Sequence, residues 1–171
     1  MAEHFPGAIQ IGGAVSRRLA PDLAQAITDV GALAEAEAAP AVLHTAEDLV
    51  AALDPENHVL RLYDHQASYG AFFNLETWLR DHGIPYDRQS DARYEYDGQA
   101  VSFRAGIGLV ERTATQDGAA TVPVEELRPV HEELRAALAE PTAETVKAAI
   151  DALDKVIGPD IPSLPPFTFI D

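Results

Sequence analysis

The stretch 92-ARYEYDGQAVSF-103 decides the predicted fold, because it has the pattern of two short strands joined by a tight turn. Asp97-Gly98 is a pair that a two-residue type I′ turn prefers. The turn sets the cross-strand pairs, which are Tyr96 with Gln99, Tyr94 with Val101 and Ala92 with Phe103. We therefore predict a β-hairpin over residues 92–103, with Arg93 and Arg104 on the same face of it.

Further strands and helices are predicted on the N-terminal side of this hairpin. Runs rich in strand formers lie at residues 8–11, 58–63 and 84–88, and the second of them leads into Asp64. Apolar residues at helical spacing predict a helix from Pro21 to about Ala36 and another that carries Phe72, Leu75 and Leu79. A short helix is expected after Thr45 as N-cap and before Pro55, and Gly83-Ile84-Pro85 is a helix stop signal.

The C-terminal third has the pattern of two helices and an apolar tail. Leu127, Val130, Leu134 and Leu138 mark one helix, in which Pro129 is acceptable only near the start of the regular part. Residues 146–157 carry a second apolar stripe, and the break at 140–142 predicts an antiparallel pair. Residues 162–170 are too apolar for a free tail, so we expect them to dock on their own domain or on another subunit. Residues 106–118 show no sustained period and are expected to be a connection.

These elements predict an α+β fold with a small mixed or antiparallel sheet, which contains the hairpin and is covered by helices, and a C-terminal helical hairpin. A chain of 171 residues fits one domain and can bury its own core. Within it we separate an α/β core at 1–105 from a helical hairpin and docking tail at 106–171. No internal repeat divides the chain.

Composition narrows the class of protein. The chain has no cysteine, which excludes disulfides and thiolate chemistry. Its N-terminus lacks the pattern of a signal peptide, and no stretch approaches the ~20 apolar residues of a membrane span, so a cytoplasmic protein is expected.

The formal net charge of −16 opposes direct binding to nucleic acid or to anionic lipid. The charge divides unevenly, at −7 for residues 1–57, −2 for 58–105 and −7 for 106–171. Nine of the 12 aromatic residues lie in the nearly neutral middle segment. Two interpretations of the acidity stay open: solubility or adaptation to high salt, and a surface that meets a basic partner.

Polar side chains around the hairpin predict a ligand site. Arginines on a rigid hairpin can hold a carboxylate or phosphate by two parallel hydrogen bonds, and an Asp-His pair at a strand end suggests acid/base chemistry. The candidate ligand-binding residues are Asp64, His65, Tyr86, Arg88, Arg93 and Arg104. The alternatives are a strand-end turn satisfied by Asp64 and an ordinary cross-strand ladder of charges.

No motif predicts an enzyme. The histidines and nearby acids have no metal-ligand spacing, and there is no Gly-x-Ser-x-Gly elbow or phosphate-binding loop of standard form. We therefore expect no catalytic residue, no metal and no cofactor.

The acidic side chains of the C-terminal hairpin are the candidate partner-binding residues, either as a solvated face or as carboxylates that imitate the spacing of phosphates. They are Glu125, Glu126, Glu132, Glu133, Glu140, Glu144, Asp151 and Asp154. The first hypothesis is a non-enzymatic module that binds a protein with a basic surface, such as an inhibitor of a nucleic-acid-binding protein. The alternatives are a small enzyme or binding domain for an anionic metabolite, with its pocket near the hairpin, and a self-associating structural module that forms a homodimer.

Overall fold

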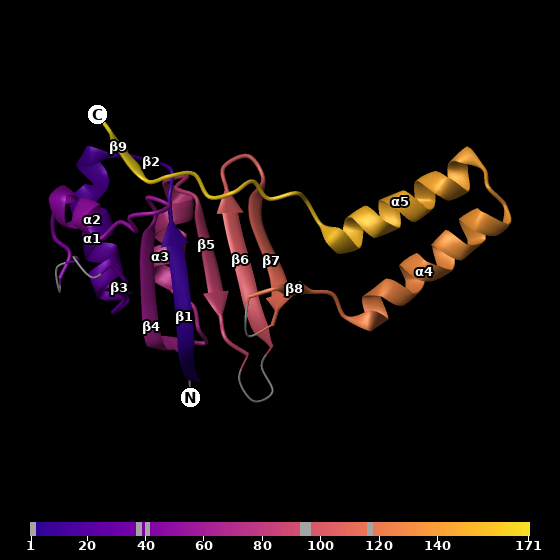
Figure 1. Cartoon of the computed structure of the whole chain (residues 1–171), viewed down its shortest axis with the longest axis horizontal. Helices are drawn as coiled ribbons and strands as arrows, with labels where there is room; N and C mark the ends of the chain where they lie inside the picture. Colours follow the sequence, from indigo (N-terminus) through magenta and orange to yellow (C-terminus); the bar gives the residue numbers. More distant parts are fainter. Residues whose placement is uncertain (1–2, 37–38, 40–41, 93–96, 116–117) are drawn as a thin grey trace.

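A computed structural model of the chain describes all residues except 1–2, 37–38, 40–41, 93–96 and 116–117. The described residues form an α+β fold built on a seven-stranded antiparallel sheet in the order β3-β4-β1-β5-β6-β7-β8 (Figure 1). The strands are β1 His4–Ile11, β3 Leu33–Ala34, β4 Leu60–Ser68, β5 Tyr86–Ser90, β6 Gly98–Arg104, β7 Gly108–Ala114 and β8 Ala120–Thr121. The predicted fold class is confirmed.

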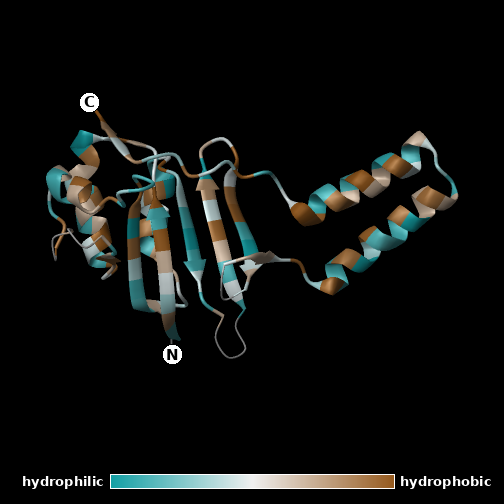
Figure 2. Ribbon diagram, in the orientation of Figure 1, coloured by the Kyte–Doolittle hydropathy of each residue, from teal (hydrophilic) through white to brown (hydrophobic). Residues whose placement is uncertain are grey.

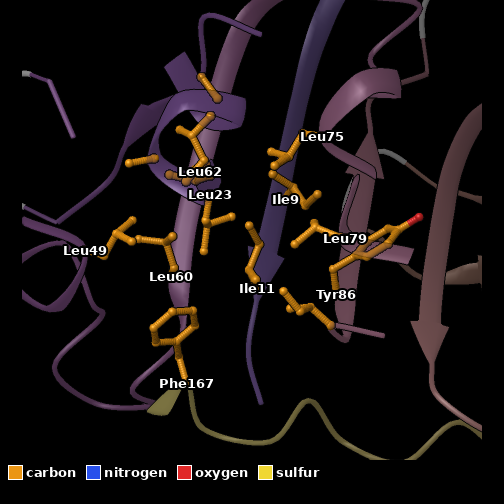
Figure 3. Close-up of a cluster of buried hydrophobic side chains, with 14 of the residues drawn as sticks. Ile9, Ile11, Leu23, Leu49, Leu60, Leu62, Leu75, Leu79, Tyr86 and Phe167 are labelled. Atoms are coloured by element: carbon orange, nitrogen blue, oxygen red, sulfur yellow. The ribbon is translucent and has the colours of Figure 1, made fainter. Parts of the chain in front are cut away.

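The core lies on one face of the sheet, where three helices pack. They are α1 Ala20–Asp29, which follows a short 3-10 turn at Arg17–Leu19, α2 Ala46–Ala51 and α3 Phe73–Asp81. Alternate residues of β1 point to this face, so Ile9 and Ile11 are completely buried. Figure 3 shows them among Leu23 of α1, Leu49 of α2 and Leu75 of α3.

Two predicted helix ends are confirmed in atomic detail. Thr45 caps α2, with its side chain accepting from the Asp48 backbone while the Asp48 carboxylate accepts from the Thr45 backbone. Backbone hydrogen bonds from His44 and Thr45 lower the pKa of the Asp48 carboxyl. After α3, Gly83 adopts φ 67° and the amide of Ile84 donates back to the carbonyl of Leu79 at 2.9 Å.

The helix predicted from Pro21 to about Ala36 is shorter than expected. It ends at Asp29, because Gly31 takes a left-handed conformation with φ 72° and its amide bonds back to Thr28. The chain then forms the short edge strand β3, in which Leu33 pairs with Tyr63 of β4.

The prediction that Asp64 and His65 stand at the end of a strand is wrong. β4 continues to Ser68 and pairs with β1 along its length. The register between the two strands shifts between Phe5 and Gly7, which marks a bulge beside Asp64 and His65. The bulge lets β4 continue past Asp64 and His65, where the sequence suggests that the strand ends.

The register predicted for the hairpin of residues 92–103 is wrong. β6 pairs with β5, so that Gln99 faces Ser90, Val101 faces Arg88 and Phe103 faces Tyr86. Gly98 is the first residue of β6 and pairs with Ala114 of β7, and a Cβ there would meet the Ala114 carbonyl oxygen at 2.6 Å. Pairing on both sides, with β5 and with β7, outweighs the local turn preference of Asp97-Gly98. Arg93, Tyr94 and Tyr96 lie outside the described residues.

The segment 106–118, expected to be a connection, contains β7. This strand pairs with β6 over its full length, from Arg104 facing Gly108 to Gly98 facing Ala114. Gly106 and Gly108 both have positive φ and make the turn between the two strands.

The predicted C-terminal helical hairpin is confirmed as α4 Val124–Ala139 and α5 Ala143–Ile157, which run antiparallel and project away from the sheet (Figure 1). We call this pair the arm. Pro129 lies inside α4, which begins five residues earlier at Val124, so the expected start near Pro129 is wrong. Thr142 caps α5 through the Thr145 backbone.

The tail docks on its own domain. It returns along the end of the sheet and forms β9 Thr168–Ile170, parallel to β2 Ala14–Ser16 (Figure 1). Phe167 is 3% exposed within the core, and its amide donates to the His58 carbonyl at 2.7 Å. Gly13 accepts the amide of Thr168 at 2.9 Å. Segments that precede and follow the arm in the sequence therefore pack into one folded unit, made of the sheet, α1 to α3 and the docked tail. We call this unit the body.

Candidate functional site

The arm differs from the rest of the chain in how little of it is buried. Only Val130 and Ala137 of α4 and Ala149 of α5 are buried, and they form the seam between the two helices. Figure 2 shows hydrophobic positions along both helices, although no part of the body lies beside them. All eight predicted partner-binding acids are exposed.

The acids of α4 gather on one face of that helix. Glu125 and Glu126 lie seven residues before Glu132 and Glu133, and seven residues is nearly two full helical turns. Glu144 of α5 lies on the same side of the arm, as its position relative to the buried Ala149 shows. We call this surface the acidic face of the arm.

The exposed apolar residues lie on the opposite face. Leu127 and Leu134 each precede a buried seam residue of α4 by three positions, and Val146 precedes the buried Ala149 of α5 by three. In two antiparallel helices the same offset turns toward the same side of the pair. The residues of this apolar face, with their exposed fractions, are Leu127 41%, Leu134 39%, Leu138 82%, Val146 43%, Ile150 51% and Ile157 52%.

Arg112 of β7 fixes the base of the arm. Its Nη2 atom donates to the carbonyl oxygens of Ile157 at 3.1 Å and Pro159 at 2.9 Å, where α5 ends. Gly158 between them has φ 73°, which lets the chain turn sharply out of the helix. The sheet therefore holds the end of α5, while the rest of the arm extends into solvent.

Arg104, a predicted ligand-binding residue, already has protein partners. Its guanidinium forms two hydrogen bonds with the Asp87 carboxylate, at 3.0 and 2.9 Å, and its Nε donates to the Pro162 carbonyl at 3.0 Å. Its Nη1 also donates to the Tyr86 carbonyl. These bonds join the sheet to the docked tail, and they occupy the donors that a bound anion would use.

Arg88 and Tyr86, two further candidates, belong to a buried polar network on the face that carries the helices. Arg88 Nε lies 3.1 Å from Glu76 Oε1, with both side chains under 8% exposed, although the contact is too bent for a hydrogen bond. Glu76 also accepts from the Phe72 amide at 2.9 Å. Arg88 donates to Gln99 Oε1 at 3.1 Å. The network ties α3 to the sheet.

The Tyr86 hydroxyl donates to Glu76 Oε2 at 3.3 Å and accepts from Arg80 Nη1 at 3.1 Å. Burial, together with the Glu76 carboxylate, raises the pKa of Tyr86 to about 12. Tyr86 therefore stays protonated and serves as a hydrogen-bonding link at neutral pH.

A cavity of about 540 Å³ opens beside this network. Arg80, Arg88 and Glu76 lie on one side of it, and the half-exposed rings of Tyr69 and Phe73 lie at its rim. Its volume suits a small molecule. The acidic side chains of Asp97 and Glu111 also line it, so its charge is mixed.

Asp64 and His65 line a different cavity, of about 430 Å³. Glu35 and Asp91 also line it, and no arginine or lysine does among the described residues. Asp64 Oδ1 accepts the Gln66 amide at 2.9 Å, as expected for a local turn-like contact. The local charge opposes an anionic ligand here.

The structure thus distributes the predicted ligand-binding residues over three places: Asp64 and His65 in one cavity, Arg88 beside another, and Arg104 under the tail. Sequence reasoning missed Glu76, Arg80 and Arg112. Glu76 carried one signal, because it lies beside Leu75 and three residues before Leu79, on the buried side of α3.

Within the described ranges, histidine and acidic side chains form no cluster of three that could hold a metal ion. None of the described helices has both the length and the apolar character needed to cross a membrane. Comparisons with protein-family models, with curated proteins and with solved structures found no match.

Proposed function

We propose that this chain is a non-enzymatic protein-binding module that presents the acidic face of the arm to a partner with a basic surface. The observation that carries the proposal is that the acidic face lies on the arm, which projects away from the body. Four glutamates of α4 point to one side of a projecting hairpin, where a partner can approach them without meeting the sheet.

Charge of this kind acts chiefly on the rate and specificity of association. A row of carboxylates attracts a basic surface from a distance and opposes wrong partners of like charge. A basic surface that normally holds nucleic acid fits this description, so the module would compete with nucleic acid for it. This is the inhibitor version of the proposal.

The test compares two variants that lose the same charge. In the arm variant, Glu125, Glu126, Glu132 and Glu133 are each changed to Gln. In the control variant, the exposed acids of the body are changed in the same number: Asp22→Asn, Glu56→Gln, Asp81→Asn and Asp160→Asn. Proteins captured from a lysate by immobilised wild-type chain are identified, purified and measured by titration against all three forms.

The proposal expects the arm variant to bind the purified basic partner at least about tenfold more weakly, and the control variant to bind like wild type. Added duplex DNA should compete with the wild-type chain, and binding should fall as salt rises. Equal losses in the two variants would mean that net charge alone matters, and the arm would have no special role.

The cavity beside Arg88 favours a second candidate function, the binding of a small anionic metabolite. Arg80 is its most accessible cation, because Arg88 is neutralised by Glu76. A thermal-shift screen with mono- and dicarboxylates and phosphates tests this. Stabilisation that is lost in Arg80→Gln but kept in Arg112→Gln would support the cavity, and no stabilising compound would count against it.

A further inference from the structure

We infer that the cavity beside Arg88 binds a zwitterion of the basic amino acid type, with its carboxylate on Arg80 and its distal amine on Glu111 and Asp97. This inference rests on the second candidate function above, the binding of a small molecule in this cavity, and it names the chemical class of the ligand. It adds a positively charged group to the anion considered there, and it does not depend on the acidic face of the arm.

One wall of the cavity is a stripe along α3. Phe73, Glu76 and Arg80 lie at i, i+3 and i+7, so they share one face of the helix, and all three line the cavity. Seven residues of an α-helix span about 10 Å. Phe73 therefore lies toward one end of the cavity and Arg80 toward the other.

The facing wall comes from the sheet, and the strand pairing shows which residues lie near the Arg80 end. Leu109 of β7 pairs with Phe103 of β6, which pairs with Tyr86 of β5. The Tyr86 hydroxyl accepts from Arg80 Nη1 at 3.1 Å. Leu109 therefore lies toward the same end of the cavity as Arg80.

The opposite end of the cavity is aromatic and acidic. Gln99 pairs with Ser90, and a Cβ on Gly70 would meet the Ser90 side chain at 2.4 Å. Tyr69, the neighbour of Gly70, therefore lies at this end, as does Asp97, two residues before Gln99. Tyr69 has φ 54°, a backbone conformation that is unfavourable for a bulky residue and recurs at ligand sites. Aromatic faces and a carboxylate both attract a positively charged amine.

Arg80 is the partner that the cavity offers to a carboxylate. Arg88, the other arginine of the cavity, is neutralised by Glu76 at 3.1 Å. Arg80 forms no ion pair within the described part of the chain, and its guanidinium donates to two hydroxyl oxygens, of Tyr86 at 3.1 Å and of Thr77 at 3.0 Å. A guanidinium has five N–H donors, so others remain for the carboxylate of a ligand.

Glu111 and Asp97 are the partners that it offers to an amine. Glu111 lies two strand spacings, about 10 Å, from Arg88, because both pair with Val101 of the strand between them. Neither acid forms an ion pair with another described residue. A simple anion would meet two uncompensated carboxylates here. A ligand with a carboxylate at one end and an amine at the other is attracted at both ends.

Apolar side chains line the space between the charged groups. Leu109 is 41% exposed and Phe73 is 58% exposed, and both line the cavity. They can cover the unbranched carbon chain of a ligand such as lysine, whose methylene groups pack on apolar surface while the amine stays polar. The cavity volume of about 540 Å³ accommodates a molecule of this size.

Three probes that share one carbon chain test the class of ligand. ε-Aminocaproate carries both charged ends, hexanoate carries only the carboxylate, and hexylamine carries only the amine. Each is titrated into the isotope-labelled full chain, and the amide chemical shifts give the dissociation constant and the place of binding. We expect ε-aminocaproate to bind at least about tenfold more tightly than either other probe, with shifts in α3, β6 and β7 and none in the arm.

Asp97→Asn with Glu111→Gln removes the proposed partners of the amine. Both side chains are exposed, so this variant should fold, and it should bind ε-aminocaproate no more tightly than hexanoate. The matched control, Asp22→Asn with Glu56→Gln, loses the same charge at exposed positions outside the cavity. It should bind ε-aminocaproate like wild type.

Arg80→Gln removes the proposed partner of the carboxylate. It should weaken the binding of ε-aminocaproate and of hexanoate by at least about fivefold. Arg18→Gln is the control, because Arg18 is exposed and does not line the cavity, and it should change neither affinity. Far-ultraviolet circular dichroism shows whether each variant keeps its secondary structure.

Equal binding of ε-aminocaproate and hexanoate, with both lost in Arg80→Gln, would overturn the inference and leave the anionic-metabolite candidate standing. Equal binding of ε-aminocaproate and hexylamine would also overturn it, because the carboxylate would then contribute nothing. So would the absence of any shift with the three probes at millimolar concentration. In that case a compound from the thermal-shift screen that needs Arg80 would still support the second candidate function, so the two ideas fail separately.

Discussion

The body and the arm contain similar apolar residues but bury them to different extents. In the body, Ile9, Ile11 and Leu60 are fully buried, three helices pack on one face of the sheet, and Phe167 of the tail joins the same core. In the arm, the two helices together contain 31 residues, of which only Val130, Ala137 and Ala149 are buried. The body covers the core face of its sheet within the chain, whereas the arm leaves its apolar face exposed.

This difference underlies our proposal that the body supplies stability and the arm supplies recognition. Short helices owe most of their stability in proteins to the packing of an apolar face, and the arm uses only part of its apolar surface. Substitutions in the body should therefore change the free energy of unfolding. Substitutions on the faces of the arm should change association and leave the free energy of unfolding of the monomer almost unchanged.

The largest expected effect is at the docked tail. Phe167→Ala removes a ring that is 3% exposed and leaves a cavity beside the core, so it should lower the free energy of unfolding by about 4 kcal/mol. Phe73→Ala is the control, because Phe73 is 58% exposed and its loss should cost far less. Urea denaturation measures both. Similar midpoints in the two variants would mean that the tail is not part of the body.

A slightly smaller effect is expected in the buried ion pair. Glu76→Gln leaves the Arg88 guanidinium buried without its counter-charge, which should cost about 3 kcal/mol. Glu47→Gln removes an exposed partner of Arg17 and should cost almost nothing. Replacing both members, as Glu76→Leu with Arg88→Met, should recover part of the loss. A Glu76→Gln variant as stable as wild type would contradict the structural role of this network.

The dependence of stability on alkaline pH should follow Tyr86. Its pKa is higher in the folded chain than its ordinary value near 10, so the folded state holds this proton more tightly. The resulting stabilisation is complete below pH 10 and is lost as the pH rises through about 12. Tyr86→Phe should remove this part of the alkaline loss. Absorbance of phenolate during a pH titration should show one tyrosine that ionises later than the others.

The smallest expected effect on the free energy of unfolding is on the arm. Leu138 is 82% exposed, so Leu138→Ser should change it by less than about 0.5 kcal/mol when measured in dilute solution. A large loss of stability in dilute solution would show that the body already covers this side chain.

Local signals in the sequence predicted the elements whose ends depend on local chemistry. Thr45 and Gly83 specify their helix ends through contacts within a few residues, and both ends were predicted correctly. The C-terminal helical hairpin was predicted for the same reason, since the break at 140–142 separates two clear apolar stripes.

Elements that depend on distant partners were predicted less well. Asp97-Gly98 looks like a tight turn, yet the partner of β6 begins at Tyr86, which decides the register. β7 was missed because its two faces differ little in polarity: Leu109 and Val110, then Glu111 and Arg112, point to opposite sides. A half-exposed strand of this kind lacks the alternation of apolar and polar residues by which a strand is recognised in a sequence.

The candidate site residues divide in the same way. The acids of the arm could be found from sequence because spacing within one helix places them together. The roles of Arg88 and Arg104 could not, because their partners Glu76 and Asp87 are set by which face of the sheet each arginine occupies. No pattern along the chain indicates that the arm projects from the body instead of packing on it.

Amide hydrogen exchange tests the central claim most directly, because it reports on the body and the arm in one sample. The account predicts that amides of β1 and β4 exchange slowly, because these strands carry the buried core. Amides of α4 and α5 should exchange markedly faster than those of β1 and β4, because the arm buries few side chains. An arm whose amides are as protected as those of β1 would contradict the account.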